Sequence, residues 1–166
     1  MKFIDKLVDA ISLAAKALVG TCLAIMLLIS IVEVVRRYLF NASFPWSEEL
    51  IRYLMIWIAF IGGAAAYKNG GLVFFDLILN KFKPKVKATI NLITNTAVLC
   101  FCIYMCERAW SYTFTASVAN QITVGLKISM SIPYLGIPIG LMLFVVFSLY
   151  NYRKLIPAFL AKGDGH

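Results

Sequence analysis

Glu33 is the residue whose type and position could do chemistry in an apolar setting, because it ends a long uncharged segment and precedes Arg36 and Arg37. On a helix, residues three and four positions apart are neighbours, so either guanidinium group can neutralise the carboxylate. A carboxylate inside a membrane is otherwise costly and usually functional. The spacing predicts a structural ion pair, and a proton-carrying carboxylate is the alternative.

Residues 40–49 form the most patterned connection in the sequence. Pro45 is expected to stop the preceding helix, and Trp46 suits the headgroup level of a bilayer. Ser47 can cap the helix that follows. A well-capped and anchored helix start explains this pattern without any ligand.

Three charged residues follow that predicted cap: Glu48, Glu49 and Arg52. The two carboxylates would lie in the first turn of the helix, where the helix dipole favours negative charge. Arg52 lies four residues after Glu48, so the two side chains are predicted to pair.

The four cysteines all lie in apolar runs, at positions 22, 100, 102 and 106. A disulfide-generating membrane enzyme would need cysteine pairs in oxidising loops. The only histidine is His166, and no nucleophile with a base, glycine-rich phosphate loop or metal-ligand set is present in the sequence. We therefore expect packing roles for the cysteines, no catalytic or substrate-binding residue, no metal, no cofactor and no enzyme activity.

The elements that position these residues fold in lipid. Four stretches without Asp, Glu, Lys or Arg cover residues 17–32, 53–67, 88–106 and 128–152. Such lengths approach or exceed the roughly 17 to 25 residues that a spanning helix needs. The composition is 61% hydrophobic and 14% charged, whereas soluble domains carry about 25% charged residues. The sequence predicts an all-α membrane protein with four transmembrane helices.

We expect a single integral membrane domain over residues 1–166. The predicted spans are residues 12–37, 50–67, 86–108 and 129–152. Interfacial amphipathic segments are predicted between them, at residues 40–49, 72–83 and 109–127. Polar Asn91 and Asn95, one turn apart in the third span, should face protein because amides avoid lipid.

The basic residues indicate orientation. Eleven lysines and arginines flank one side of the predicted membrane and five flank the other. Short loops rich in lysine and arginine stay in the cytoplasm, so both termini are predicted to be cytoplasmic. No single basic stripe forms, which argues against a nucleic-acid partner.

Small residues recur one turn apart in two predicted spans. Gly62, Gly63 and Ala66 lie in the second span, and Gly136 and Gly140 lie in the fourth. In a bilayer such spacing lets another backbone approach closely. The partner backbone can belong to this chain or to another protein. Pro138, between the last two glycines, is expected to kink its helix.

Residues 72–83 are too short to cross a membrane and carry Asp76 on their polar side. A lopsided helix of this kind lies along an interface. We expect contact with lipid headgroups from the basic residues in and after it and from one tryptophan of the third connection. These candidates are Lys81, Lys83, Lys85, Lys87 and Trp110.

The motifs together resemble the small membrane subunit of tripartite ATP-independent periplasmic (TRAP) transporters, the DctQ-like family. They are Arg37-Tyr38-Leu39-Phe40-Asn41, Pro45-Trp46-Ser47-Glu48-Glu49-Leu50, Arg52-Tyr53, Trp57, Phe60-Ile61-Gly62-Gly63-Ala64, Lys68-Asn69-Gly70-Gly71, Asp76-Leu77, Ile132-Pro133-Tyr134 and Ile137-Pro138-Ile139-Gly140. Members commonly have a histidine just after the paired glycines, where this chain has Leu72.

The resemblance implies a small scaffold or accessory subunit of a sodium-coupled, binding-protein-dependent importer in the bacterial inner membrane. The implied partners are a large TRAP permease subunit, forming a heterodimer, a periplasmic substrate-binding protein and membrane lipids. The implied cargo is an organic acid of the sialic acid or C4-dicarboxylate class. The assembly candidates are Trp46, Glu48, Glu49, Arg52, Gly62, Gly63, Ala66, Asp76, Gly136 and Gly140.

Two other classes remain as alternatives. A self-sufficient small proton-coupled exporter would use Glu33 as its carrier. A membrane redox enzyme would show a titratable disulfide or a bound quinone.

Overall fold

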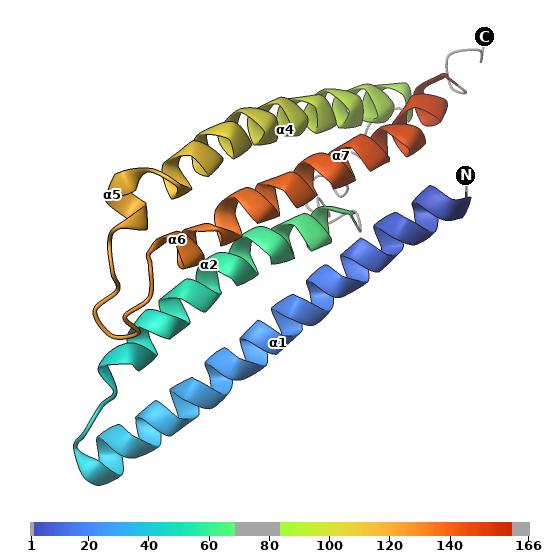
Figure 1. Cartoon of the computed structure of the whole chain (residues 1–166). Coiled ribbons are helices and arrows are strands. Elements are labelled where there is room, and N and C mark those ends of the chain that lie inside the picture. Colours follow the sequence, from blue (N-terminus) through green and yellow to red (C-terminus); the bar gives the residue numbers. More distant parts are fainter. Residues whose placement is uncertain (1, 69–83, 161–166) are drawn as a thin grey trace.

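The computed structural model describes residues 2–68 and 84–160, and four long helices dominate them (Figure 1). These are α1 (Lys2–Phe40), α2 (Pro45–Lys68), α4 (Pro84–Thr113) and α7 (Gly136–Leu160), with the single-turn helices α5 (Ala116–Ala119) and α6 (Ser131–Tyr134) before α7. Each long helix contains a segment long and apolar enough to cross a membrane. The predicted all-α membrane fold with four spanning helices is confirmed.

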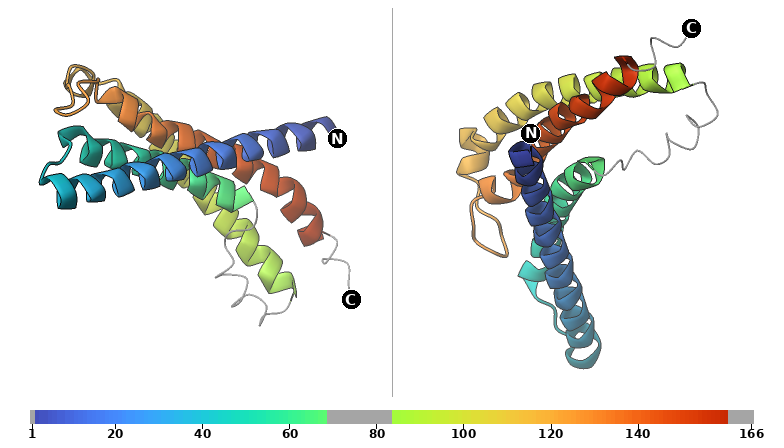
Figure 2. Two further views of the ribbon diagram at one scale, coloured as in Figure 1. Left: turned by 90° about the horizontal axis from the view of Figure 1, so that it is seen from below. Right: turned by 90° about the vertical axis from the view of Figure 1, so that its right-hand side faces the viewer.

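The four long helices form a row and do not close into a bundle. α1 packs on α2, α2 on α7, and α7 on α4 (Figures 1 and 2). α1 and α4 therefore occupy the two edges of the row (Figure 1). The right panel of Figure 2 shows α1 running in a direction different from that of α4 and α7. Within the most apolar 18-residue window of α1, no residue is buried. An edge helix of this kind offers most of its surface to lipid or to another protein.

One side of α1 packs against the rest of the row, and its residues recur every three or four positions. Buried or half-buried residues at this spacing are Val8, Ser12, Ala15, Val19, Cys22, Met26, Ile29 and Glu33, and the half-buried Ile11 and Ser30 lie next to members of this series. Val8 joins a cluster with Ala64 of α2, and Ala15 joins a second cluster with Ile61. A strict three-four repeat is the spacing of left-handed coiled coils. The α1–α2 pair is thus a two-helix seam inside the membrane.

α2 and α7 approach each other closely at glycines. A Cβ atom placed on Gly140 would lie 2.5 Å from the Cβ of Phe60, and one on Gly136 would lie 2.9 Å from the Trp57 ring. A Cβ atom on Gly63 would lie 3.2 Å from the Phe144 ring, which is tighter than an ordinary contact. Close backbone approach is the main way in which membrane helices gain packing energy, so the glycines of α7 let this crossing form.

A buried polar contact joins α2, α4 and α7. The Tyr67 hydroxyl donates to the side-chain oxygen of Asn95, whose side-chain nitrogen donates to the Ser148 carbonyl at 3.2 Å. The Ser148 hydroxyl donates back to the Asn95 side-chain oxygen at 3.1 Å. Asn95 is only 4% exposed, so the prediction that it faces protein is confirmed. These bonds align α4 with α7.

The helix bounds differ from the predicted segments in two connections. Residues 40–49 contain no separate interfacial helix, because α1 ends at Phe40 and α2 already begins at Pro45. Asn41 has a positive φ of 47°, the left-handed conformation that commonly ends a helix. Residues 109–127 comprise the end of α4, the short α5 and a loop. α1 also begins at Lys2 instead of near residue 12.

Helix α7 is preceded by a break that the prolines explain. Leu135 separates α6 from α7, three residues before the fully buried Pro138. Proline has no N–H to donate to the carbonyl of residue 134, so the helix is weakest in the turn before it. The helix is thus interrupted one turn before Pro138, the residue at which a kink was predicted.

Candidate functional site

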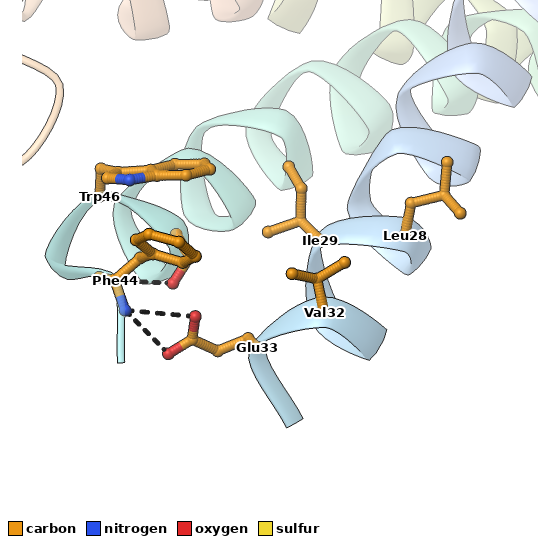
Figure 3. A pocket seen from close by; sticks show the side chains of 7 residues that line it. Leu28, Ile29, Val32, Glu33, Phe44 and Trp46 are labelled. Carbon is orange, nitrogen blue, oxygen red and sulfur yellow. Dashed lines mark hydrogen bonds between the residues drawn. The ribbon is translucent and has the colours of Figure 1, made fainter. Parts of the chain in front are cut away.

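Glu33 binds the start of the neighbouring helix. Both of its carboxylate oxygens accept from the Phe44 backbone N–H, at 3.2 and 3.3 Å (Figure 3). Residues 41–44 turn the chain back so that the amino end of α2, with its free N–H groups and positive dipole, lies beside α1. The Arg36 guanidinium lies 3.6 Å above the Phe44 ring, and Arg37 pairs with Glu48 at 3.9 Å. The predicted Glu33 ion pair with these arginines is therefore wrong: a backbone donor takes their place.

The start of α2 is organised differently from the predicted cap. Pro45 is the first helical residue, a position that suits its fixed φ, so it begins a helix and does not end one. The Ser47 hydroxyl donates to the Phe44 carbonyl at 2.8 Å from inside the first turn. Ser47 is thus a buried residue of α2 and not its cap, and the capping acceptor comes from α1 as Glu33.

Glu49 holds a distant loop. One carboxylate oxygen accepts from Tyr53 at 2.8 Å, and the other accepts from the backbone N–H groups of Gly125 and Leu126 at 2.7 and 3.1 Å. A Cβ atom on Gly125 would lie 2.7 Å from the Trp46 Cα atom, so a side chain there would push the loop away from α2. Glu49 therefore fixes the loop to the start of α2.

We call residues 122–129 the hairpin loop. Ile122 and Ser129 form an antiparallel bridge across it, and the Thr123 N–H donates to the Ile128 carbonyl at 2.9 Å. Lys127 turns the chain with a φ of 54°. Val124 is 91% exposed. Sequence reasoning missed this loop, because Glu49 contacts Gly125 and Leu126, which are 76 and 77 positions away in the sequence.

The four corner candidates divide between the interior and the surface. Trp46 is half-buried with its ring centroid 5.1 Å from that of Phe44, and Glu49 is bound as described. Glu48 and Arg52 are both exposed. Glu48 pairs across the connection with Arg37 and not along the helix with Arg52 as predicted. The side chains available for a partner are thus Glu48 and Arg52.

The other end of the molecule contains an ionic cluster that sequence reasoning also missed. The Lys68 ammonium contacts the Asp9 carboxylate at 2.7 Å and the Val8 carbonyl at 3.0 Å, and the Lys68 side chain is only 8% exposed. Asp5 pairs with Arg153 at 3.6 Å. These contacts fasten the first turns of α1 to α2 and α7, which explains why α1 extends so far toward its amino end. The signal for this cluster in the sequence was the pair Asp5 and Asp9, two acidic residues one helical turn apart near the amino terminus.

The two polar ends are separated by about the thickness of a bilayer. Asp9 and Glu33 are 24 positions apart on one helix, which corresponds to about 36 Å at 1.5 Å per residue. The hydrocarbon core of a membrane is about 30 Å thick. The Asp9–Lys68 contact and the Glu33–Phe44 contact therefore mark the two headgroup levels of the row.

The small-residue candidates are used mainly inside the chain. Gly136 and Gly140 contact α2, Gly62 faces Val19 of α1, and Ala66 is exposed. The remaining candidates lie at the helix ends or outside the described residues. Lys85 and Lys87 lie in the first turn of α4, and Trp110 is exposed near its end. The predicted segment 72–83, with Asp76, Lys81 and Lys83, falls outside the described residues. Among residues 2–68 and 84–160, no group of three acids, cysteines or histidines could hold a metal.

Comparison with known proteins points to one family. The model of the DctQ component of tripartite ATP-independent periplasmic transporters matches residues 26–158. A protein of Haemophilus influenzae named as a TRAP transporter small permease protein is 33% identical over 132 residues, which cover 78% of this chain and 75% of that protein.

Two further relatives match with lower identity. The C4-dicarboxylate TRAP transporter small permease protein DctQ of Vibrio cholerae is 24% identical over 148 residues, covering 76% of this chain and 64% of that protein. The sialic acid TRAP transporter permease protein SiaT of Haemophilus influenzae is 27% identical over 105 residues. That match covers 63% of this chain and 16% of SiaT.

Proposed function

Because the chain belongs to the DctQ family of TRAP transporter components, we propose that it is the scaffold subunit that supports a large permease subunit. It is a multi-pass protein of the bacterial inner membrane, and its family is a transporter subunit family and not an enzyme family. The large subunit binds and moves the substrate, and this chain supplies a fixed surface beside it. No residue of this chain is assigned to the substrate.

The open row of helices is the observation that carries this proposal. α1 and α4 lie at opposite edges of the row, so within residues 2–68 and 84–160 the four long helices are arranged side by side and not around a common centre (Figure 1). A self-sufficient transporter places its substrate near the middle of the membrane between interrupted helices. The unburied apolar window of α1 instead offers a long surface for a second polypeptide. In SiaT the matched region is 16% of one longer permease chain, which supports the same association.

The finer features follow from the family. We propose sodium-coupled import of an organic acid delivered by a periplasmic binding protein. The relatives are named for C4-dicarboxylate and sialic acid, both organic acids, and this chain carries no feature that chooses between them. The excess of basic residues on one side favours cytoplasmic termini, which places the hairpin loop and the Glu33 contact on the periplasmic side.

The exposed members of the corner are the proposed partner contacts. Glu48 and Arg52 lie on the surface at the start of α2, whereas Glu49 is bound inside the chain. Glu48→Lys is therefore expected to reduce recovery of the complex without loosening the hairpin loop. Glu49→Lys would disturb the loop itself. If Glu48→Lys leaves both recovery of the complex and uptake at the wild-type level, Glu48 is not a partner contact.

Co-purification tests the proposal as a whole. The tagged chain is expressed with a large TRAP permease subunit from the same organism and reconstituted in vesicles with a TRAP binding protein. Uptake of a labelled organic acid is expected only when all three proteins and a sodium gradient are present. Transport by this chain alone would overturn the proposal.

The exporter alternative is disfavoured by the Glu33 geometry. A proton carrier must alternate between a protonated and a free carboxylate, but both oxygens of Glu33 accept from a backbone N–H at a helix end. The geometry of Glu33 is that of an acceptor that caps the start of α2.

A further inference from the structure

A small apolar pocket, which we call the α1–α2 slot, lies between the last third of α1 and the start of α2 (Figure 3). Its volume is about 170 Å³. Leu28 and Val32 form one wall and are 61% and 51% exposed, so the slot is open on the outer side of the row. Phe44 and Trp46 form the opposite wall. The only charged residue that lines it is Glu33, whose carboxylate is already bound to the Phe44 N–H.

The slot lies at the depth where the headgroups meet the hydrocarbon. Glu33 marks the polar level at this end, and Leu28 is five residues deeper along α1, which is about 8 Å at 1.5 Å per residue. Tryptophan prefers this boundary, where its ring is partly in lipid. An occupant of the slot therefore has an apolar part below Glu33 and a polar part above it.

Two arginines, Arg36 and Arg37, lie one helical turn beyond Glu33 on α1. The Arg36 guanidinium is held 3.6 Å from the Phe44 ring centroid, which orients it beside the slot. The Arg37 side chain is 65% exposed, and it contacts Glu48, whose side chain is 72% exposed, at 3.9 Å. Exposed pairs of this length contribute little, so Arg37 can exchange its partner. Guanidinium groups bind phosphate oxygens with two parallel hydrogen bonds.

We propose that the α1–α2 slot binds one acyl chain of a phospholipid whose phosphate is held by Arg36 and Arg37. Size separates this occupant from a partner helix. A helix with its side chains is about 10 to 12 Å across and cannot enter a space of 170 Å³, whereas a segment of acyl chain can. The apolar walls take the chain, and the charged rim takes the phosphate, so one molecule satisfies both parts.

Fluorescence quenching tests the chain position. Trp57 and Trp110 are replaced by phenylalanine, which leaves Trp46 as the only tryptophan. The full chain is placed in nanodiscs that contain a minor fraction of phospholipid with brominated acyl chains. Strong quenching of Trp46 is expected, and Val32→Phe, which fills the slot, should abolish most of it. Val34→Phe is the matched control, because Val34 is an exposed apolar residue of α1 that does not line the slot.

Native mass spectrometry of the detergent-purified chain tests the phosphate contact. Arg37→Gln is expected to weaken phospholipid retention about tenfold, the effect of losing one charge-assisted contact. Arg108→Gln removes an exposed arginine of α4 and should leave retention unchanged. Equal quenching in Val32→Phe and Val34→Phe, or equal retention in the two glutamine variants, would mean unspecific annular lipid and overturn the proposal. Loss of quenching when the large permease is bound would assign the slot to a partner side chain and overturn it too.

Discussion

Replacing Gly140 by alanine tests whether the crossing of α2 and α7 depends on direct backbone approach. The new Cβ atom would lie 2.5 Å from the Phe60 Cβ, 2.7 Å from its carbonyl carbon and 3.0 Å from its carbonyl oxygen. Carbon atoms in ordinary contact are about 3.5 Å apart, so the two helices must separate by roughly 1 Å. Overpacking of this kind costs about 1 to 3 kcal/mol.

Gly20→Ala is the matched control for the helix propensity of alanine. Both glycines lie inside long helices, but nothing lies within 4 Å of a Cβ atom on Gly20. Both variants gain up to about 1 kcal/mol of helix propensity, and only Gly140→Ala meets the clash. The difference between the two free energies of unfolding is therefore the expected 1 to 3 kcal/mol.

Reversible unfolding by sodium dodecyl sulfate in mixed micelles, followed by circular dichroism, measures that difference. The second-site change Phe60→Ala should not rescue Gly140→Ala, because alanine keeps all three of the clashing atoms. Equal unfolding midpoints for Gly140→Ala and Gly20→Ala would refute the close crossing. Rescue by Phe60→Ala would show that a side chain, and not the backbone, limits the approach.

The remaining predictions concern the two polar ends and the orientation. Glu49→Ala should speed amide hydrogen exchange in the hairpin loop, because the Glu49 carboxylate accepts from the Gly125 and Leu126 N–H groups; unchanged exchange by mass spectrometry would contradict the anchoring role. Asp9→Asn should destabilise the chain more than Lys68→Met in detergent unfolding, because it leaves an ammonium that is buried in the protein without its carboxylate. The reverse order would show that the Lys68 ammonium does not depend on Asp9. In a variant without the native cysteines, Ser117→Cys should react with an impermeant thiol reagent outside the cell and Lys6→Cys should not; the opposite pattern would invert the orientation.

The sequence predicted the residues that enter the membrane because that property is local. A charge-free stretch of sufficient length is decided by its own composition. Three of the four such stretches lie inside α1, α2 and α4, and the fourth covers α6 and most of α7. The buried position of Asn95 followed from the same local reasoning, because an amide side chain avoids lipid whichever helices pack around it. Close packing at Gly136 and Gly140 was also predictable, although which helix would be the partner was not.

The contacts of the acidic residues could not be read from neighbours in the sequence. Spacing favoured Arg36 and Arg37 as partners of Glu33, and Arg52 as the partner of Glu48. Free backbone N–H groups at a helix start compete with arginine for a carboxylate. They come close to Glu33 only because residues 41–44 reverse the direction of the chain. The bond from Glu33 to Phe44 therefore required the fold.

By itself the sequence determined that this is a membrane protein with four apolar helices, and its motifs indicated the family. The tertiary structure decided that the helices form an open row, and that Glu49 anchors a loop 76 residues away while Lys68 binds Asp9 across 59 residues. Whether a stretch is apolar enough to enter a membrane depends only on the residues within that stretch, so the sequence alone fixes it. Pairing between distant polar groups depends on which helices pack together, because only packing brings them within hydrogen-bonding distance.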